Sequence, residues 1–92
     1  MNALTCPDTL DQRHLIVIST RSPIDCLAAI ADALPRVGGR MGGLSLKPVG
    51  GQFEAILRLS CLGDDGADRA ASLIAAWPNA GSVRVEHQWV RL

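Results

Sequence analysis

The sequence predicts an α+β sandwich, in which a four-stranded antiparallel sheet of strand order 4-1-3-2 carries two helices on one face. Three observations predict it. Four stretches of strand pattern and two of helical period follow one another as β-α-β-β-α-β, and a Gly-Gly pair of the kind found in hairpin turns separates the two middle strands. Right-handed β-α-β crossovers joined by a hairpin then place the first and third strands at the centre.

The first strand is predicted over residues 14–20, where a β-branched apolar run carries no helix or strand breaker. A continuous run of this kind is typical of a strand buried on both faces. Residues 1–13 are polar and show no period, so we interpret them as a tail that precedes a single domain over residues 14–92.

The first helix is predicted to begin at Pro23, a residue favoured in the first helical position. Ser22 is placed to cap it, with Asp25 three residues later as the acid of a capping box. Pro35 and the following Gly38-Gly39 are expected to end it. Apolar residues at steps of three and four predict that one stripe faces the core, namely Ile24, Leu27, Ile30, Ala31 and Leu34.

The second strand is predicted from about Met41 to Val49 and contains Pro48, which cannot donate to a ladder and therefore indicates a sheet edge. Gly50-Gly51 predicts the hairpin. The third strand, Gln52 to Leu62, alternates most clearly, and we expect one set of its side chains to face the helices: Phe53, Ala55, Leu57, Leu59 and Cys61.

The second helix follows the loop Gly63–Gly66, with Asp65 as its expected N-cap and Asp68 three residues later. Pro78 is expected to end it. Its predicted core stripe consists of Ala67, Ala70, Ala71, Leu73, Ile74 and Trp77, and the last strand alternates Val83, Val85, His87 and Trp89 with polar residues. The whole pattern is that of a ferredoxin-like fold.

Composition excludes several function classes. Nine Lys and Arg balance nine Asp and Glu, so no basic stripe is present to bind a nucleic-acid backbone. No apolar run approaches the ~20 residues that span a membrane, and the N-terminus does not resemble a secretory signal, so we expect a cytoplasmic protein. Cys6, Cys26 and Cys61 form no C-x-x-C pair, which argues against disulfides and zinc.

We therefore expect no catalytic site, no metal site and no cofactor, and a module that is not an enzyme. His87 and His14 fit strand positions better than catalytic ones. Asp64, Asp65 and Asp68 suggest either a cation site or helix capping, and capping is the plainer account because no other ligand type lies nearby.

Residues from the first helix into the second strand resemble ACT domains, the small amino-acid-sensing modules of metabolic enzymes. Among them the chain is most similar to the small regulatory subunits of acetolactate synthase, which act in branched-chain amino-acid biosynthesis. The resemblance spans roughly residues 14–86, and its apolar and glycine positions are matched without a gap by Leu27, Ile30, Ala33, Leu34, Gly38, Met41 and Leu44. It implies a regulatory subunit that binds and activates a large enzyme subunit, or alternatively a stand-alone amino-acid-binding dimer.

The resemblance also implies where an amino-acid effector would bind: Arg21, Ser22, Pro23, Asp25, Gly39, Arg40 and Met41. Sensing members carry Asn, Gly and Asn at three positions where this chain has Ser22, Asp25 and Arg40. Asp25 would repel a carboxylate at close range, so we expect weak or absent binding of branched-chain amino acids. Arg21 is either a carboxylate clamp or a solvated loop charge, and Arg40 either an anion ligand or an ion-pair partner.

We also expect a homodimer, or a hetero-oligomer with a large enzyme subunit, through the sheet edge or the face away from the helices. Ile56 must point to that face, together with one of two alternating sets on the first strand, Leu15/Val17 or Ile16/Ile18. An apolar patch in such a small domain is rarely left bare. The expected interface residues are Ile56, Gly42, Gly43 and Lys47, where the two glycines either allow close approach or begin a flexible edge strand.

Overall fold

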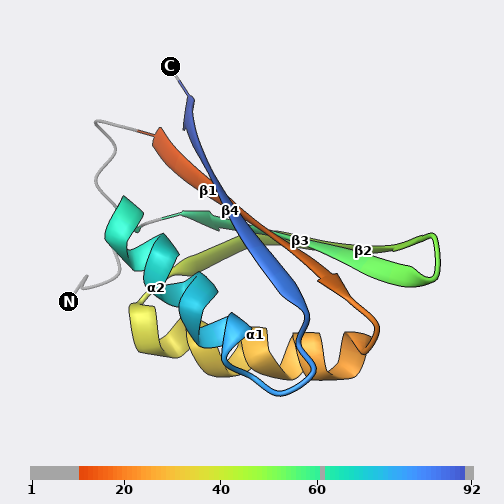
Figure 1. Ribbon diagram of the computed structural model, residues 1–92. Coiled ribbons are helices and arrows are strands. Elements are labelled where there is room, and N and C mark those ends of the chain that lie inside the picture. Colours follow the sequence, from red (N-terminus) through yellow and green to blue (C-terminus); the bar gives the residue numbers. More distant parts are fainter. Residues whose placement is uncertain (1–10, 61, 91–92) are drawn as a thin grey trace.

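The computed structural model describes residues 11–60 and 62–90. The elements run in the order β1 (Asp11–Thr20), α1 (Pro23–Val37), β2 (Arg40–Val49), β3 (Gln52–Ser60), α2 (Asp64–Ala75) and β4 (Ser82–Val90). Both helices lie on one face of the sheet (Figure 1). Neither is long and apolar enough to cross a membrane.

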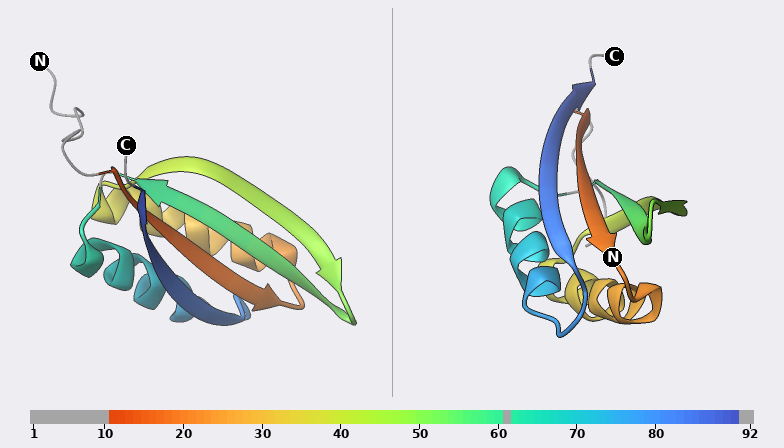
Figure 2. Two further views of the ribbon diagram at one scale, coloured as in Figure 1. Left: turned by 90° about the horizontal axis from the view of Figure 1, so that it is seen from above. Right: turned by 45° about the vertical axis from the view of Figure 1, so that its right-hand side comes forward.

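The sheet has the order β2-β3-β1-β4 and all of its neighbouring strands are antiparallel, which confirms the predicted ferredoxin-like topology. β1 and β3 are central, and β2 and β4 form the edges (Figure 2). β1 begins at Asp11 rather than residue 14, because β4 continues to Val90 and pairs with that earlier segment. β3 ends at Ser60, and Cys61 lies outside the described residues.

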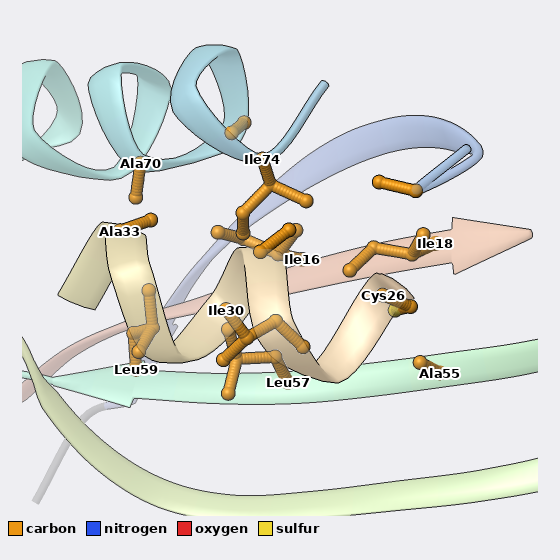
Figure 3. Close-up of a cluster of buried hydrophobic side chains, with 13 residues drawn as sticks. Ile16, Ile18, Cys26, Ile30, Ala33, Ala55, Leu57, Leu59, Ala70 and Ile74 are labelled. Carbon is orange, nitrogen blue, oxygen red and sulfur yellow. The ribbon is translucent and has the colours of Figure 1, made fainter. Parts of the chain in front are cut away.

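The core lies between the sheet and the two helices (Figure 3). Ile16 and Ile18 of β1 face the helices, so Leu15 and Val17 are the set on the opposite face. The cluster of buried residues draws on β1, β3, the helices and the loop before β4, and of the described residues none comes from β2: Ile16, Ile18, Cys26, Ala29, Ile30, Ala33, Ala55, Leu57, Leu59, Ala70, Ala71, Ile74 and Ala80.

The predicted core stripe of α1 is confirmed at Ile30, which is 4% exposed, and at Leu34, which packs against the core, but its phase is wrong elsewhere. Ile24 is 81% exposed and Leu27 40%, whereas Cys26, Ala29 and Ala33 are buried. The buried stripe is rotated from the expected one by roughly a third of a turn at about 100° per residue. Small side chains on this stripe and the buried Ala70 and Ala71 of α2 allow the two helices to pack closely, and that packing determines which apolar face of α1 turns inward.

The structure confirms the position of the first predicted helix cap, though not its hydrogen bond, and corrects the second cap. Ser22 is the N-cap residue of α1, but its hydroxyl makes no capping hydrogen bond and instead donates to Asp25 Oδ2 at 2.7 Å. α2 begins one residue before the expected cap, with Gly63 at the N-cap and Asp64 and Asp65 in the first turn. Carboxylates in the first turn are attracted by the positive end of the helix dipole. These aspartates therefore stabilise α2, although neither of them is its N-cap residue.

Candidate functional site

A shallow polar depression of about 530 Å³ lies where β1 ends and α1 begins. The start of β3 and the loop between α2 and β4 complete its wall. The residues around it are Ser19, Arg21, Ser22, Asp25, Gln52, Asn79, Gly81 and Ser82.

The entrance to α1 is fixed by Thr20, which is 1% exposed. Its hydroxyl oxygen accepts the Ser22 N–H at 2.9 Å, and its hydroxyl lies 3.1 Å from the Ser22 carbonyl oxygen. Asp25 then places a carboxylate beside the Ser22 hydroxyl in the first turn of α1. The chain's own carboxylate therefore stands at the positive end of the helix.

The loop between α2 and β4 reaches the depression through two residues in unusual backbone conformations. Asn79 has a φ of 64° and Gly81 a φ of 121°. A Cβ at Gly81 would collide with the Ser19 carbonyl oxygen and would lie 2.9 Å from its carbon. Only glycine allows the start of β4 to approach the end of β1 this closely.

The structure divides the predicted effector site into two groups. Arg21, Ser22 and Asp25 lie at the depression and Pro23 opens α1 beside them. Gly39, Arg40 and Met41 follow the other end of α1, a helix of 15 residues and thus roughly 22 Å long. Arg40 pairs with Ser60, at the end of β3 remote from the depression. Within one chain these seven residues therefore do not form one site.

Five other residues at the depression were not among the predicted site residues: Ser19, Gln52, Asn79, Gly81 and Ser82. They are four ordinary polar residues and a glycine, and they form no motif. The predicted strand order was the available signal, since it brings the end of β1, the start of β3 and the start of β4 to one end of the sheet.

Two charged side chains, Arg21 and Asp25, lie at this end of the sheet. Arg21 is exposed and Asp25 is hydrogen-bonded to Ser22. In the described part of the chain, no three His, Cys, Asp or Glu residues come together as metal ligands, and no buried side-chain nitrogen or oxygen lacks a hydrogen-bond partner. The acids Asp64, Asp65 and Asp68 are thus not joined into such a group.

His14 is fully buried on the helix-facing side of β1. Its Nε2 lies 2.8 Å from the Leu62 carbonyl oxygen, which only accepts, so Nε2 carries the proton. Its Nδ1 lies 4.0 Å from Asp64 Oδ1. His14 therefore connects β1 to the segment that leads from β3 into α2, which is a structural role. The side chain of His87 lies outside the described residues.

The buried thiol of Cys26 also has a structural role. It packs in the core, and burial raises its pKa, so the thiol stays protonated at neutral pH. A nucleophilic cysteine needs the opposite shift.

Six of the large apolar side chains that remain exposed in the described residues lie on the helix-facing side of β2 and β3 and on the neighbouring flank of α1, whereas Val49, 50% exposed, lies apart at the end of β2. We call this set the α1–β2 surface. It comprises Ile24 (81% exposed), Leu27 (40%), Met41 (51%), Leu44 (38%), Leu46 (40%) and Phe53 (36%). The register with β3 places Met41, Leu44 and Leu46 beside Leu59, Leu57 and Ala55, which face the helices.

The residues of the predicted interface lie elsewhere. Ile56 is half-buried on the opposite face of the sheet, beside Val17, which is only 6% exposed. Lys47 forms an ion pair with Glu54 at 3.7 Å. Gly42 lies at a register shift between Met41 and Gly43. A Cβ at Gly42 or Gly43 would have ordinary contacts with Arg58, so neither glycine is required by crowding.

No protein-family model matches the chain. No curated protein sequence matches it either. The fold does have solved relatives. The C-terminal domain of the MgtC protein from Mycobacterium tuberculosis is similar over 91% of this chain and 93% of that domain, with a TM-score of 0.66 and 16% identity. The uncharacterized protein TM1266 from Thermotoga maritima is similar over 88% of this chain and 100% of that one, with a TM-score of 0.57 and 12% identity. At these identities the likeness establishes the ferredoxin-like fold.

Proposed function

We propose that this protein is a non-catalytic, ACT-like regulatory module of the cytoplasm that acts by binding another protein. The observation that carries the proposal is the α1–β2 surface, where six large apolar side chains are at least 36% exposed on adjacent elements. An exposed apolar patch on a small domain is characteristic of a protein–protein contact. The resemblance of residues 14–86 to the small subunits of acetolactate synthase suggests the large synthase subunit as the partner.

Reconstitution tests this proposal. The chain and the large acetolactate synthase subunit of the same organism are purified separately, mixed, and analysed by size-exclusion chromatography and by the rate of acetolactate formation. We expect co-elution and a higher rate in the mixture, and no acetolactate formation by the chain alone. An Ile24→Lys variant should weaken co-elution if the α1–β2 surface makes the contact. Separate elution with an unchanged rate would reject the synthase as partner.

The depression at the start of α1 supports a second candidate, a stand-alone module that binds an amino acid. Its hydroxyl, amide and guanidinium groups can hydrogen-bond a small polar ligand. Asp25 opposes a ligand carboxylate there, so valine, leucine and isoleucine should bind weakly or not at all. Calorimetric titration distinguishes the candidates. Micromolar affinity for one of these amino acids would favour the second candidate, and Asp25→Asn should then raise that affinity further.

A further inference from the structure

The two helices leave one strand of the sheet uncovered. α2 packs on β4 and β1, and α1 packs on β1 and β3, whereas the main contacts of β2 are with β3. Figure 2 shows β2 along the edge farthest from β4, and Figure 3 shows the buried cluster between β1, β3 and the helices. The helix-facing leucines of β2, Leu44 and Leu46, therefore have a vacant position above them.

The exposed flank of α1 is apolar and is suited to cover Leu44 and Leu46 of another chain. The helical wheel places Ile24, Leu27 and Ala31 on the flank turned away from the Ala33 stripe that packs on α2. One chain thus presents both an apolar helix flank and an apolar strand face without a helix. When a twofold axis parallel to α1 relates two copies, the helix flank of each copy lies on the uncovered strand face of the other, because an isologous interface uses the same two surfaces from both chains.

We propose that a second copy of this chain docks on the α1–β2 surface, with its α1 beside the first α1 and above β2. The helices α2, α1, α1 of the partner and α2 of the partner then form one layer between two sheets. Each chain contributes the helix that covers Leu44 and Leu46 of the other.

The free edge of β2 is a poorer site for self-association. Pro48 cannot donate a ladder hydrogen bond, and the register shift between Met41 and Gly43 interrupts the strand near its other end. Proline, bulges and charged side chains such as Lys47 are features that protect an edge from pairing. Only about five residues of regular strand remain between them, so docking of the helix is favoured over pairing of the edges.

Area and charge both suit a weak dimer. The strip from the flank of α1 to the edge of β2 is roughly 22 Å long and 20 Å wide, from the rise of a helix and the spacing of strands. This footprint is about 440 Å² per chain and roughly 900 Å² in total, which is the size of a weak or transient interface rather than of a permanent one. The surface contains no charged residue, and the nearby Arg36 and Asp32 pair with each other at 3.3 Å, so no like charges are brought together.

The inference goes beyond the proposed function, because it concerns the isolated chain and needs no enzyme. Both contacts use the α1–β2 surface, so a bound synthase subunit would displace the second copy. The synthase could fail as a partner and the dimer would stand. If the chain alone stays monomeric while it binds the synthase subunit, the present inference fails and the proposed function stands.

Sedimentation velocity of the purified chain from 1 to 500 µM tests the dimer. We expect a concentration-dependent shift from monomer to dimer with a micromolar Kd. Ile24→Lys and Leu46→Thr should each raise that Kd at least tenfold, and Ile56→Thr, on the opposite face, should leave it within about twofold. Circular dichroism checks that each variant is folded. A monomer at 500 µM would overturn the inference, as would a dimer weakened only by Ile56→Thr.

Oxidative cross-linking separates helix docking from edge pairing. In a background with Cys6, Cys26 and Cys61 replaced by alanine, a single cysteine is introduced as Ala31→Cys on the flank of α1 or as Ser45→Cys in the middle of β2. Both positions are exposed. We expect disulfide-linked dimers from Ala31→Cys and few from Ser45→Cys. The reverse result would show pairing of β2 edges and would overturn the inference.

Discussion

Gly81→Ala should destabilise the protein more than alanine at any other glycine that the structure describes. The φ of 121° at Gly81 is a conformation that L-residues rarely adopt. Such backbone strain costs about 1–3 kcal/mol. The new Cβ would also collide with the Ser19 carbonyl group and would lie 3.0 Å from Thr20 Cα, both of them backbone atoms that belong to a central strand. Relief of this overlap costs about another 1–3 kcal/mol.

The two costs together amount to about 2–6 kcal/mol, out of a total of roughly 5–14 kcal/mol for a chain of this length. At about 4–8 °C per kcal/mol, even the lower bound should lower the melting temperature by roughly 8–16 °C. Thermal unfolding followed by circular dichroism measures the shift. Gly51→Ala is the matched control, because Gly51 has an ordinary φ and no neighbour within 4 Å of an added Cβ. If the two variants melt within about 3 °C of each other, the close approach of β4 to β1 is wrong.

Three further predictions concern the core. Ala33→Leu should cost about 1–3 kcal/mol because it overfills the contact with α2, whereas Ala31→Leu, at an exposed position, should not destabilise the monomer. Urea unfolding at low protein concentration compares the two variants. A larger loss of stability in Ala31→Leu than in Ala33→Leu would support the helix phase predicted from sequence. His14→Leu should cost about 1–3 kcal/mol, since it removes the donor to the Leu62 carbonyl, and an unchanged urea midpoint would refute that role. Burial raises the pKa of the Cys26 thiol, so the folded state holds this proton more tightly than the unfolded state. The contribution of this proton to the free energy of unfolding is complete below the ordinary thiol pKa of about 8.5 and is lost as pH rises through the raised pKa. Urea unfolding from about pH 7 to 10.5 should show this loss of stability in the parent chain. In Cys26→Ala the part of the pH dependence that comes from the thiol should be absent.

The strand order could be predicted from the sequence because its signals are independent of tertiary contacts. The alternation in β3 identifies a central strand, the Gly50-Gly51 turn joins it to β2 as a hairpin, and Pro48 places β2 at an edge. Together these signals leave a single topology. The N-caps could not be predicted in the same way. Ser22 has two partners within reach, the helix N–H groups and the Asp25 carboxylate, and only the local geometry decides between them.

The candidate site was predictable only in part. A helix entrance can be recognised from Ser22 and Pro23, and the structure places Arg21, Ser22 and Asp25 together at the depression. Arg40 was grouped with them through the resemblance, yet it lies at the other end of the sheet. Sequence proximity to α1 does not distinguish the two ends of that helix within one chain.

The phase of α1 matters beyond the fold, because one helix carries two apolar stripes. The stripe with Ala33 consists mainly of small residues and is buried against α2. The stripe with Ile24 and Leu27 has larger side chains and is exposed. A helix that only had to complete its own core would gain nothing from the larger residues at the exposed positions. The folding of the monomer and the association of two copies should therefore respond to different substitutions on the same helix. Ala33→Leu should lower the urea midpoint at every protein concentration. Ile24→Lys should leave the midpoint of the monomer unchanged and remove its dependence on concentration.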